Sequence, residues 1–308
     1  MRARRNDVKP EESIMWGPVL VLLICLCVAL YTGQSFFNRM FSEHYEGSAE
    51  AATPVFSTVY ALIVALVTFL MNGCRFSPSL TTVLFGMGNG VILFLYNLGM
   101  IQAARKGPYS FQSITMLFGS VVVCLVFAAL FWGDPITPLQ LLGIGLMLAA
   151  FVIFNAGGLT LSGVKKGYFF WCTLLFLTNG FYGVLMDAQQ RSMPDERNEM
   201  IMVVFLSLGV ISLGYLLFSQ KGKIAGAFAM SGKTAAFASL SSLCAAFAVF
   251  LLMLLMKSMP SYILLTIING GVLVFSAALS FVVLREKPTK MTFLGIAVSV
   301  LSIVLLSL

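Results

Sequence analysis

Amide and hydroxyl side chains recur inside the apolar stretches of this 308-residue chain, and they are the groups that could bind a polar ligand. Their spacing follows a helix: Gln34 and Asn38, for example, are four residues apart and share one helix face. Inside a membrane such side chains usually face the protein interior or a watery cavity. The residues predicted to line a ligand cavity are Gln34, Asn38, Asn89, Tyr96, Asn97, Gln112, Asn179, Tyr182, Thr266 and Asn269.

Packing between helices is the alternative role for these side chains. Serine and threonine hydroxyls commonly join membrane helices, at about 0.5–1 kcal/mol for each hydrogen bond. A primary amide is harder to satisfy in a helix bundle, because burying an unpaired amide is costly. The sequence therefore leaves both roles open for the amides and tyrosines, and it favours the packing role for the serines.

Other kinds of chemistry find little support in the sequence. The chain has six cysteines and no CxxC pair, and its single histidine, His44, falls in a connection. No Asp, Glu, Lys or Arg stands at the centre of a predicted span, and Arg39 and Asp187 stand near span ends. We therefore expect no metal site, no disulfide framework, no cofactor and no enzymatic activity.

The composition indicates a membrane protein. Apolar residues make up 59% of the chain and charged residues only 10%, far from the averages of soluble proteins. A membrane-spanning helix needs about 20 mainly apolar residues. The net charge of +7 comes from bases in the connections, which are typical of membrane-flanking anchors and do not indicate a nucleic-acid partner. Ten spans are predicted, at about 15–38, 54–72, 80–103, 108–132, 138–157, 167–188, 199–219, 233–256, 260–284 and 290–308.

The stretch from Arg105 to Gly143 occurs twice. A shift of 152 residues places it on Lys257 to Gly295, with Gly119 on Gly271 in a gap-free register. The first spans of the two halves also match, at an offset of 146, where Thr32, Phe36 and Met40 fall on Thr178, Tyr182 and Met186. These matches indicate a duplicated unit. The predicted division is a disordered tail at 1–14, a first repeat at 15–157 and a second repeat at 158–308.

An odd number of spans in each repeat has a topological consequence. After five spans the second copy enters the membrane from the opposite side, so the halves form an inverted repeat. The predicted fold class is an all-α integral membrane protein whose ten transmembrane helices form two inverted five-helix repeats. This architecture is typical of alternating-access transporters.

Three local features carry further expectations. Thr137 and Gln140 have the spacing of a capping box at a helix start. Asp134 and Glu286, at matching places in the repeats, either complement a helix N-terminus or form a gating ion pair. The run from Asn269 to Gly271 could interrupt a helix near mid-membrane, and an unbroken helix there would contradict that hypothesis.

The pattern resembles the drug/metabolite transporter superfamily, and its EamA-type members above all. The resemblance rests on the doubled five-span unit, on Pro108 and Pro260 opening spans four and nine, and on an acid followed nine residues later by glycine. The two acid–glycine pairs are Asp134 with Gly143 and Glu286 with Gly295.

The resemblance implies a ten-helix bundle in the cytoplasmic membrane, with both termini cytoplasmic. It implies a cavity lined mainly by spans one, three, four, six, eight and nine. The function that we expect is secondary transport, with export the expected direction, of a small polar or zwitterionic metabolite such as an amino acid. A non-transporting sensor or scaffold, or an exporter of organic cations, are the alternatives. The expected partners are the substrate and the lipid bilayer, with a monomer and a homodimer both open.

Charge counting leaves the orientation open. With the N-terminus inside, eight Lys and Arg residues fall on the inner side and eleven on the outer side, which runs against the rule that inner connections are more basic. The basic N-terminal tail favours the opposite conclusion.

Overall fold

The computed structural model describes residues 17–107, 109–155, 164–220, 224, 226–282 and 290–307. Within this part of the chain every regular element is helical, with ten α-helices and one π-helical turn. The elements are α2 (Gly17–His44), α3 (Ala49–Met71), α4 (Leu80–Ala104), α5 (Tyr109–Phe127), η1 (Ala128–Trp132), α6 (Pro138–Asn155), α7 (Tyr168–Ser192), α8 (Arg197–Ser219), α9 (Gly232–Leu255), α10 (Ser261–Val282) and α11 (Lys290–Ser307).

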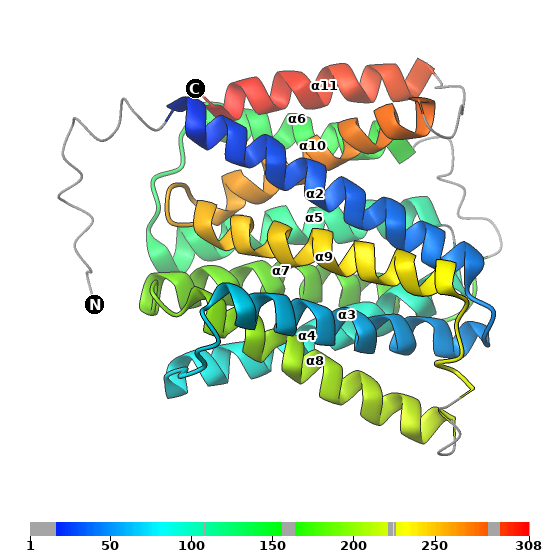
Figure 1. The fold of residues 1–308 in the computed structure, drawn as a ribbon. Coiled ribbons are helices and arrows are strands. Elements are labelled where there is room, and N and C mark those ends of the chain that lie inside the picture. The colour runs from blue at the N-terminus through cyan, green and yellow to red at the C-terminus, as the bar shows by residue number, and fades with distance from the viewer. Residues whose placement is uncertain are drawn as a thin grey trace.

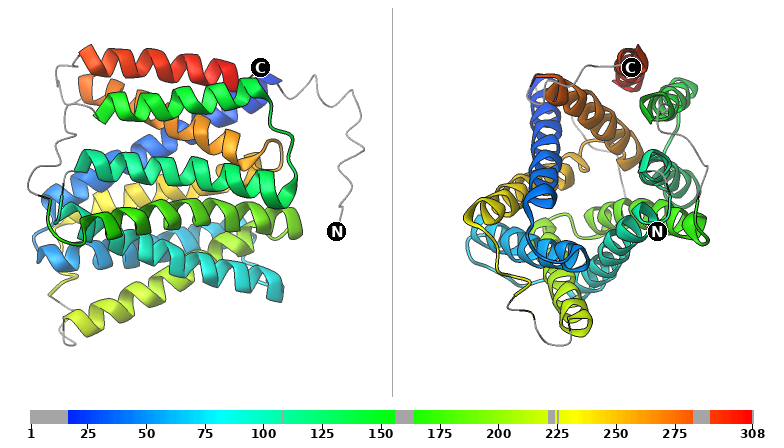
Figure 2. Two further views of the ribbon diagram at one scale, coloured as in Figure 1. Left: turned by 180° about the vertical axis from the view of Figure 1, so that it is seen from behind. Right: turned by 90° about the vertical axis from the view of Figure 1, so that its right-hand side faces the viewer.

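The helices run back and forth between two ends of one bundle (Figure 1). We call the end where α2 begins and α11 finishes the proximal end, and the other the distal end. Seen end-on, α6 and α11 lie together at one edge and α8 lies at the opposite edge (Figure 2). The remaining helices lie between these edges, and α2 packs along α9 while α4 packs along α7.

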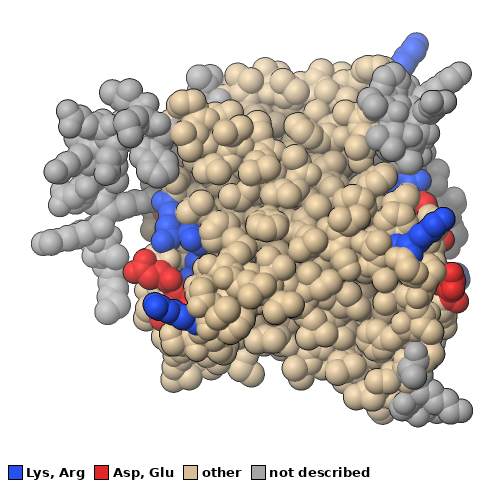
Figure 3. All heavy atoms as spheres, viewed as in Figure 1, with Lys and Arg blue, Asp and Glu red and all other residues tan. Residues whose placement is uncertain are grey.

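The bundle has the surface of a multi-pass membrane protein. Eight helices are long and apolar enough to cross a membrane, and α6 and α11, with 18 residues each, are shorter apolar helices. In Figure 3 the charged side chains gather at the two ends, and the described surface between them carries no charged side chains on this face. Each predicted span overlaps one described α-helix, the fourth also includes η1, and the boundaries differ by up to six residues, the most at the end of α2.

Two local predictions can be compared with the helices. The capping box is confirmed, because the Gln140 backbone N–H donates to Thr137 Oγ1 and the Thr137 N–H donates to Gln140 Oε1, each at 3.2 Å. The predicted break at Asn269 is wrong, since α10 is continuous from Ser261 to Val282. Neighbouring side chains from Met147 and Val28 fill the space beside Gly270 and Gly271, so the glycines serve close packing. Pro108, Glu286 and the boundary between the predicted repeats at 157 and 158 lie outside the described residues.

A close crossing holds α5 against α7. A methyl group added at Gly119 of α5 would collide with the backbone carbonyl of Phe176, and one at Gly180 of α7 would lie 2.6 Å from the Gly119 carbonyl oxygen. At Gly119 the obstacle is backbone, which cannot move aside as a flexible side chain can; at Gly180 the nearest atom is Cβ of Val123, and the Gly119 carbonyl oxygen is the next. Small residues at such crossings let membrane helices approach closely and gain van der Waals contact.

Replacing Gly119 by alanine is therefore expected to separate the two helices and to destabilise the protein by about 1–3 kcal/mol, the usual cost of overpacking. The thermal melting midpoint of the detergent-purified protein measures the effect. Gly145→Ala is the control, because no atom lies within 4 Å of the added methyl group. Equal melting of the two variants would contradict the role of the crossing.

Candidate functional site

A cavity of about 140 Å³ lies where helices from both halves of the chain meet. Helices α2, α3 and α4 come from the first half, and α7 and α9 from the second. The lining residues are Tyr31, Gln34, Tyr60, Leu93, Tyr96, Asn179, Tyr182 and Val249. Four of the eight are tyrosines and two are amides, so hydrogen-bonding groups stand among mainly apolar ring and aliphatic surface.

Hydrogen bonds position the polar lining. Gln34 Nε2 donates to the Tyr60 hydroxyl at 3.2 Å, which links α2 to α3. Asn179 Nδ2 donates to the Met116 carbonyl oxygen at 2.8 Å, which links α7 to α5. The Tyr96 hydroxyl contacts the Met116 sulfur from α4. Both bonds use the amide NH2 groups, so the Gln34 and Asn179 side-chain oxygens keep their capacity to accept hydrogen bonds.

None of the eight lining side chains carries a charge at neutral pH. A ligand held there gains hydrogen bonds to amides and hydroxyls and contact with aromatic rings, and no full ion pair with the lining. Sites for drug-sized molecules usually enclose about 300–1,000 Å³. The smaller volume here favours a small metabolite over a large drug.

The structure brings together four of the ten residues predicted from the sequence. Gln34, Tyr96, Asn179 and Tyr182 line the cavity. Asn89 lies directly behind it, buried, and its Nδ2 donates to the Tyr182 carbonyl oxygen at 3.3 Å.

The other five predicted residues do not line this cavity. Asn97 donates to Ser57 Oγ at 3.1 Å, Gln112 to the Met100 carbonyl oxygen at 3.0 Å, and Asn269 to Ser120 Oγ at 2.8 Å. Thr266 donates to the Tyr262 carbonyl oxygen of its own helix, and Asn38 is exposed on α2. In this conformation the first three amides hold neighbouring helices together.

Four lining residues were not among the predicted ones. Leu93 and Val249 are apolar, and nothing in the sequence separates them from other packing residues. Tyr31 lies three residues before Gln34, so helical spacing could have identified it. Tyr60 comes from the second span, which the family resemblance did not assign to the cavity. A lone tyrosine within an aliphatic span is the available signal, because its hydroxyl needs a partner when buried.

An ionic cluster joins the two halves at the proximal end. Arg191 on α7 forms two hydrogen bonds to Asp134 of the first half, with Nη2 to Oδ2 at 2.6 Å and Nη1 to Oδ1 at 3.2 Å. Its Nε donates to Asp187 Oδ1 at 3.0 Å, and its guanidinium lies 4.3 Å from the centre of the Trp132 ring. The Asp134 and Asp187 side chains are only 5% and 2% exposed. Asp134 thus forms an ion pair with Arg191, and its gating role stays a prediction.

A second polar cluster lies at the same end, where α8 begins. Glu196 Oε2 accepts hydrogen bonds from the Ser79 N–H at 2.9 Å and from the Ser79 hydroxyl at 2.8 Å. Hydrogen bonding from Thr82 and then from Ser79 lowers the pKa of Glu196 below its usual value. Glu199 Oε1 accepts from Asn72 Nδ2 at 2.9 Å. These contacts tie the connection between α3 and α4 to the second half of the chain.

Arg191→Gln is expected to lower the free energy of unfolding markedly, since it leaves two nearly buried carboxylates without a cation. Breaking a buried ion pair costs about 3–5 kcal/mol. Arg191 itself is 31% exposed, so the lower part of that range is expected. Thermal melting of the purified protein is the measurement. Lys257→Gln is the matched control, because Lys257 lies 4.0 Å from a fully exposed Asp195, and its loss should change little. Equal melting midpoints for Arg191→Gln and the control would contradict this account of the cluster.

The fold and the cavity define a multi-pass helical membrane protein with an internal polar site. Residues 166–308 match the model of the EamA-like transporter family, which is part of the drug/metabolite transporter superfamily. The match covers slightly less than half of the chain, from just before α7 onward, and it confirms the resemblance to this family that the sequence showed.

Solved structures share the whole fold. One crystal structure of a protein superposes with a TM-score of 0.73 over 94% of this chain and 98% of that one. At 16% sequence identity this likeness shows the fold alone. None of the curated proteins compared with the chain matches it significantly.

Proposed function

We propose that the protein is a secondary transporter that moves a small polar or zwitterionic metabolite, such as an amino acid, out of the cell by alternating access. In this proposal the protein lies in the cytoplasmic membrane with both termini cytoplasmic. The single observation that carries the proposal is the uncharged cavity of tyrosines and amides, enclosed by helices from both halves of the chain.

The pairing of the helices supports the inverted-repeat part of the proposal. Exchanging each helix of the first half for its counterpart in the second converts the α2–α9 pair into the α7–α4 pair, and both pairs pack extensively. The same exchange leaves the α3–α8 and α6–α11 pairs unchanged, and these also pack along each other. Such a pattern is what two units related by a two-fold axis in the membrane plane would give.

The ionic cluster suggests which conformation this is. Arg191 ties the second half to Asp134 of the first half at the proximal end. Opening a path from the cavity to that end requires the halves to separate, so the Arg191–Asp134 pair would have to break. The conformation is then the one closed at the proximal, cytoplasmic end, and substrate entry from that side follows the loss of this contact.

One observation favours a second candidate, an exporter of small organic cations. Four tyrosine rings border the cavity, and aromatic faces attract cations without an acidic partner. The cavity volume of about 140 Å³ restricts this candidate to small amines.

Replacement of the Tyr60 hydroxyl distinguishes the candidates. Tyr60→Phe removes a hydrogen-bonding group and keeps the ring, so affinity for a polar metabolite should fall about fivefold, the effect of one hydrogen bond of about 1 kcal/mol. Affinity for a small quaternary amine should change little, whereas Tyr182→Leu should weaken it because the ring is lost. The measurement is saturable counterflow in proteoliposomes with amino acids, nucleosides, sugars and quaternary amines.

Thr266→Val is the matched control for these variants. It is nearly isosteric and buried, and its hydroxyl bonds only within α10, away from the cavity. Transport that is saturable and unaffected by all cavity substitutions would contradict the proposed site. Absence of counterflow with every compound, in protein that is folded and correctly inserted, would favour the sensor or scaffold alternative.

A further inference from the structure

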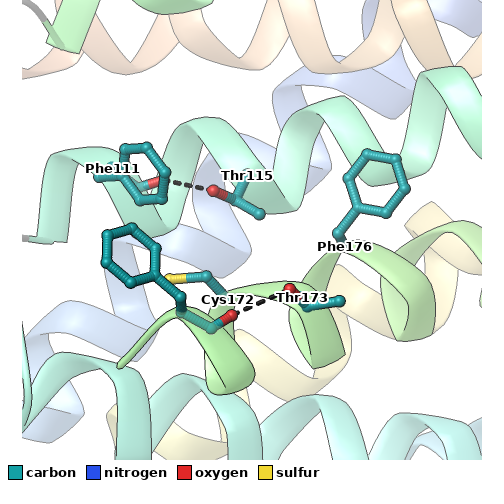
Figure 4. A pocket seen from close by; sticks show the side chains of 6 residues that line it. Phe111, Thr115, Cys172, Thr173 and Phe176 are labelled. Carbon is teal, nitrogen blue, oxygen red and sulfur yellow. Dashed lines mark hydrogen bonds between the residues drawn. The ribbon is translucent and has the colours of Figure 1, made fainter. Parts of the chain in front are cut away.

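A second and larger hollow, of about 250 Å³, lies on the outer surface between α5 and α7. It is lined by Phe111, Thr115, Phe169, Cys172, Thr173 and Phe176. Figure 4 shows these side chains between the two helices. Both threonine hydroxyls donate to carbonyl oxygens of their own helices, Thr115 to Phe111 at 2.8 Å and Thr173 to Phe169 at 2.9 Å. The hollow therefore presents an apolar wall with no unpaired threonine donor.

The groove lies where an acyl chain of a bilayer lipid would lie. It begins at the ring pair of Phe111 and Phe169, whose centroids are 5.9 Å apart, and it reaches Phe176 beside the close crossing at Gly119. Phe176 lies seven residues after Phe169, a rise of about 10 Å along α7 from the distal end toward mid-membrane. Phe169 is 54% exposed, so the groove opens to the surrounding hydrocarbon.

Basic residues surround the distal end of the groove. Arg105 and Lys106 follow α4, and Lys165 and Lys166 precede α7. The two connections are joined by a 2.8 Å hydrogen bond from the Lys165 N–H to the Lys106 carbonyl oxygen. Within the described ranges no carboxylate forms an ion pair with Lys106, Lys165 or Lys166. Lys165 and Lys166 are exposed, at the level where a lipid headgroup would lie.

We propose that this groove and its basic rim form a binding site for one anionic phospholipid of the bilayer. One acyl chain lies between α5 and α7 against the three phenylalanines, and the phosphate-containing headgroup lies against Lys106, Lys165 and Lys166. Each basic residue near a membrane surface adds a similar amount to the binding free energy of an anionic lipid. Several such residues close together therefore select an anionic lipid over a zwitterionic one. The site differs from the cavity in its apolar lining and in its place on the outer surface.

Native mass spectrometry of the full-length protein can test this site. The protein is titrated with equal amounts of phosphatidylglycerol and phosphatidylcholine, and the bound lipids are counted. Wild-type protein should retain one phosphatidylglycerol molecule in preference to phosphatidylcholine. The double variant Lys165→Gln/Lys166→Gln should lower that preference roughly 30-fold at low ionic strength. Lys233→Gln/Lys290→Gln removes two exposed charges from the same end, away from the groove, and should keep the preference.

A second variant tests the groove itself. Thr115→Phe fills the hollow and breaks no tertiary hydrogen bond, so it should remove the tightly held lipid of either headgroup while the melting midpoint in lipid-free detergent stays close to that of wild type. Retention of the bound phosphatidylglycerol in this variant would overturn the chain-binding half of the proposal. Equal loss of preference in the two lysine double variants, or equal binding of both lipids by wild type, would overturn the headgroup half.

Discussion

The proximal end depends on one guanidinium held between two carboxylates that are almost completely buried. Asp134 comes from the first half of the chain and Asp187 from the second, so Arg191 is the link between them. Without a cation, two charges of the same sign would share a poorly solvated site, and each would lack compensation for its lost hydration. Backbone irregularity makes the contact possible. The π-helical turn Ala128–Trp132 ends at Gly133, whose φ of 63° lies in the left-handed region, and this directs Asp134 back toward α7.

Amide side chains both line the cavity and join neighbouring helices in this protein, and the difference lies in where each amide stands in the bundle. Asn179 donates to a backbone carbonyl and also lines the cavity. Asn269 also donates to a neighbour, but it joins α10 to α5 and is not among the residues that line this cavity. An amide that donates one hydrogen bond to a neighbouring helix can thus serve binding or packing. What the rest of its side chain faces in the folded bundle decides between the two roles.

That distinction explains how far the sequence could predict the molecule. Apolar length and the doubled segment were sufficient for the helices, because each span is a local property of about 20 residues. The Thr137–Gln140 capping box was predictable for the same reason.

The cavity was only half predictable, since the rotation of each helix about its axis depends on neighbours that are distant in sequence. Gln34 and Asn38 share one face of α2, yet Gln34 lines the cavity and Asn38 is exposed beyond it. The Arg191–Asp134 contact joins residues 57 positions apart, and no pattern in the chain specifies it.

The duplicated sequence also accounts for an inequality between the halves. The register that pairs Thr32 with Thr178 pairs Gln34 with Gly180. In the second half Gly180 lets α7 approach the backbone of α5 at Gly119, and the two helices pack along each other closely. In the first half the same place holds a glutamine, and α2 packs less extensively against α10. Gln34 extends instead toward Tyr60 and the cavity. This difference between two matched positions accompanies a tight helix crossing at Gly180 and a polar side chain in the cavity at Gln34. The α2–α9 and α4–α7 pairs both pack extensively, so a glycine at one position and a glutamine at the other are compatible with the same helix pairing, while the local packing differs.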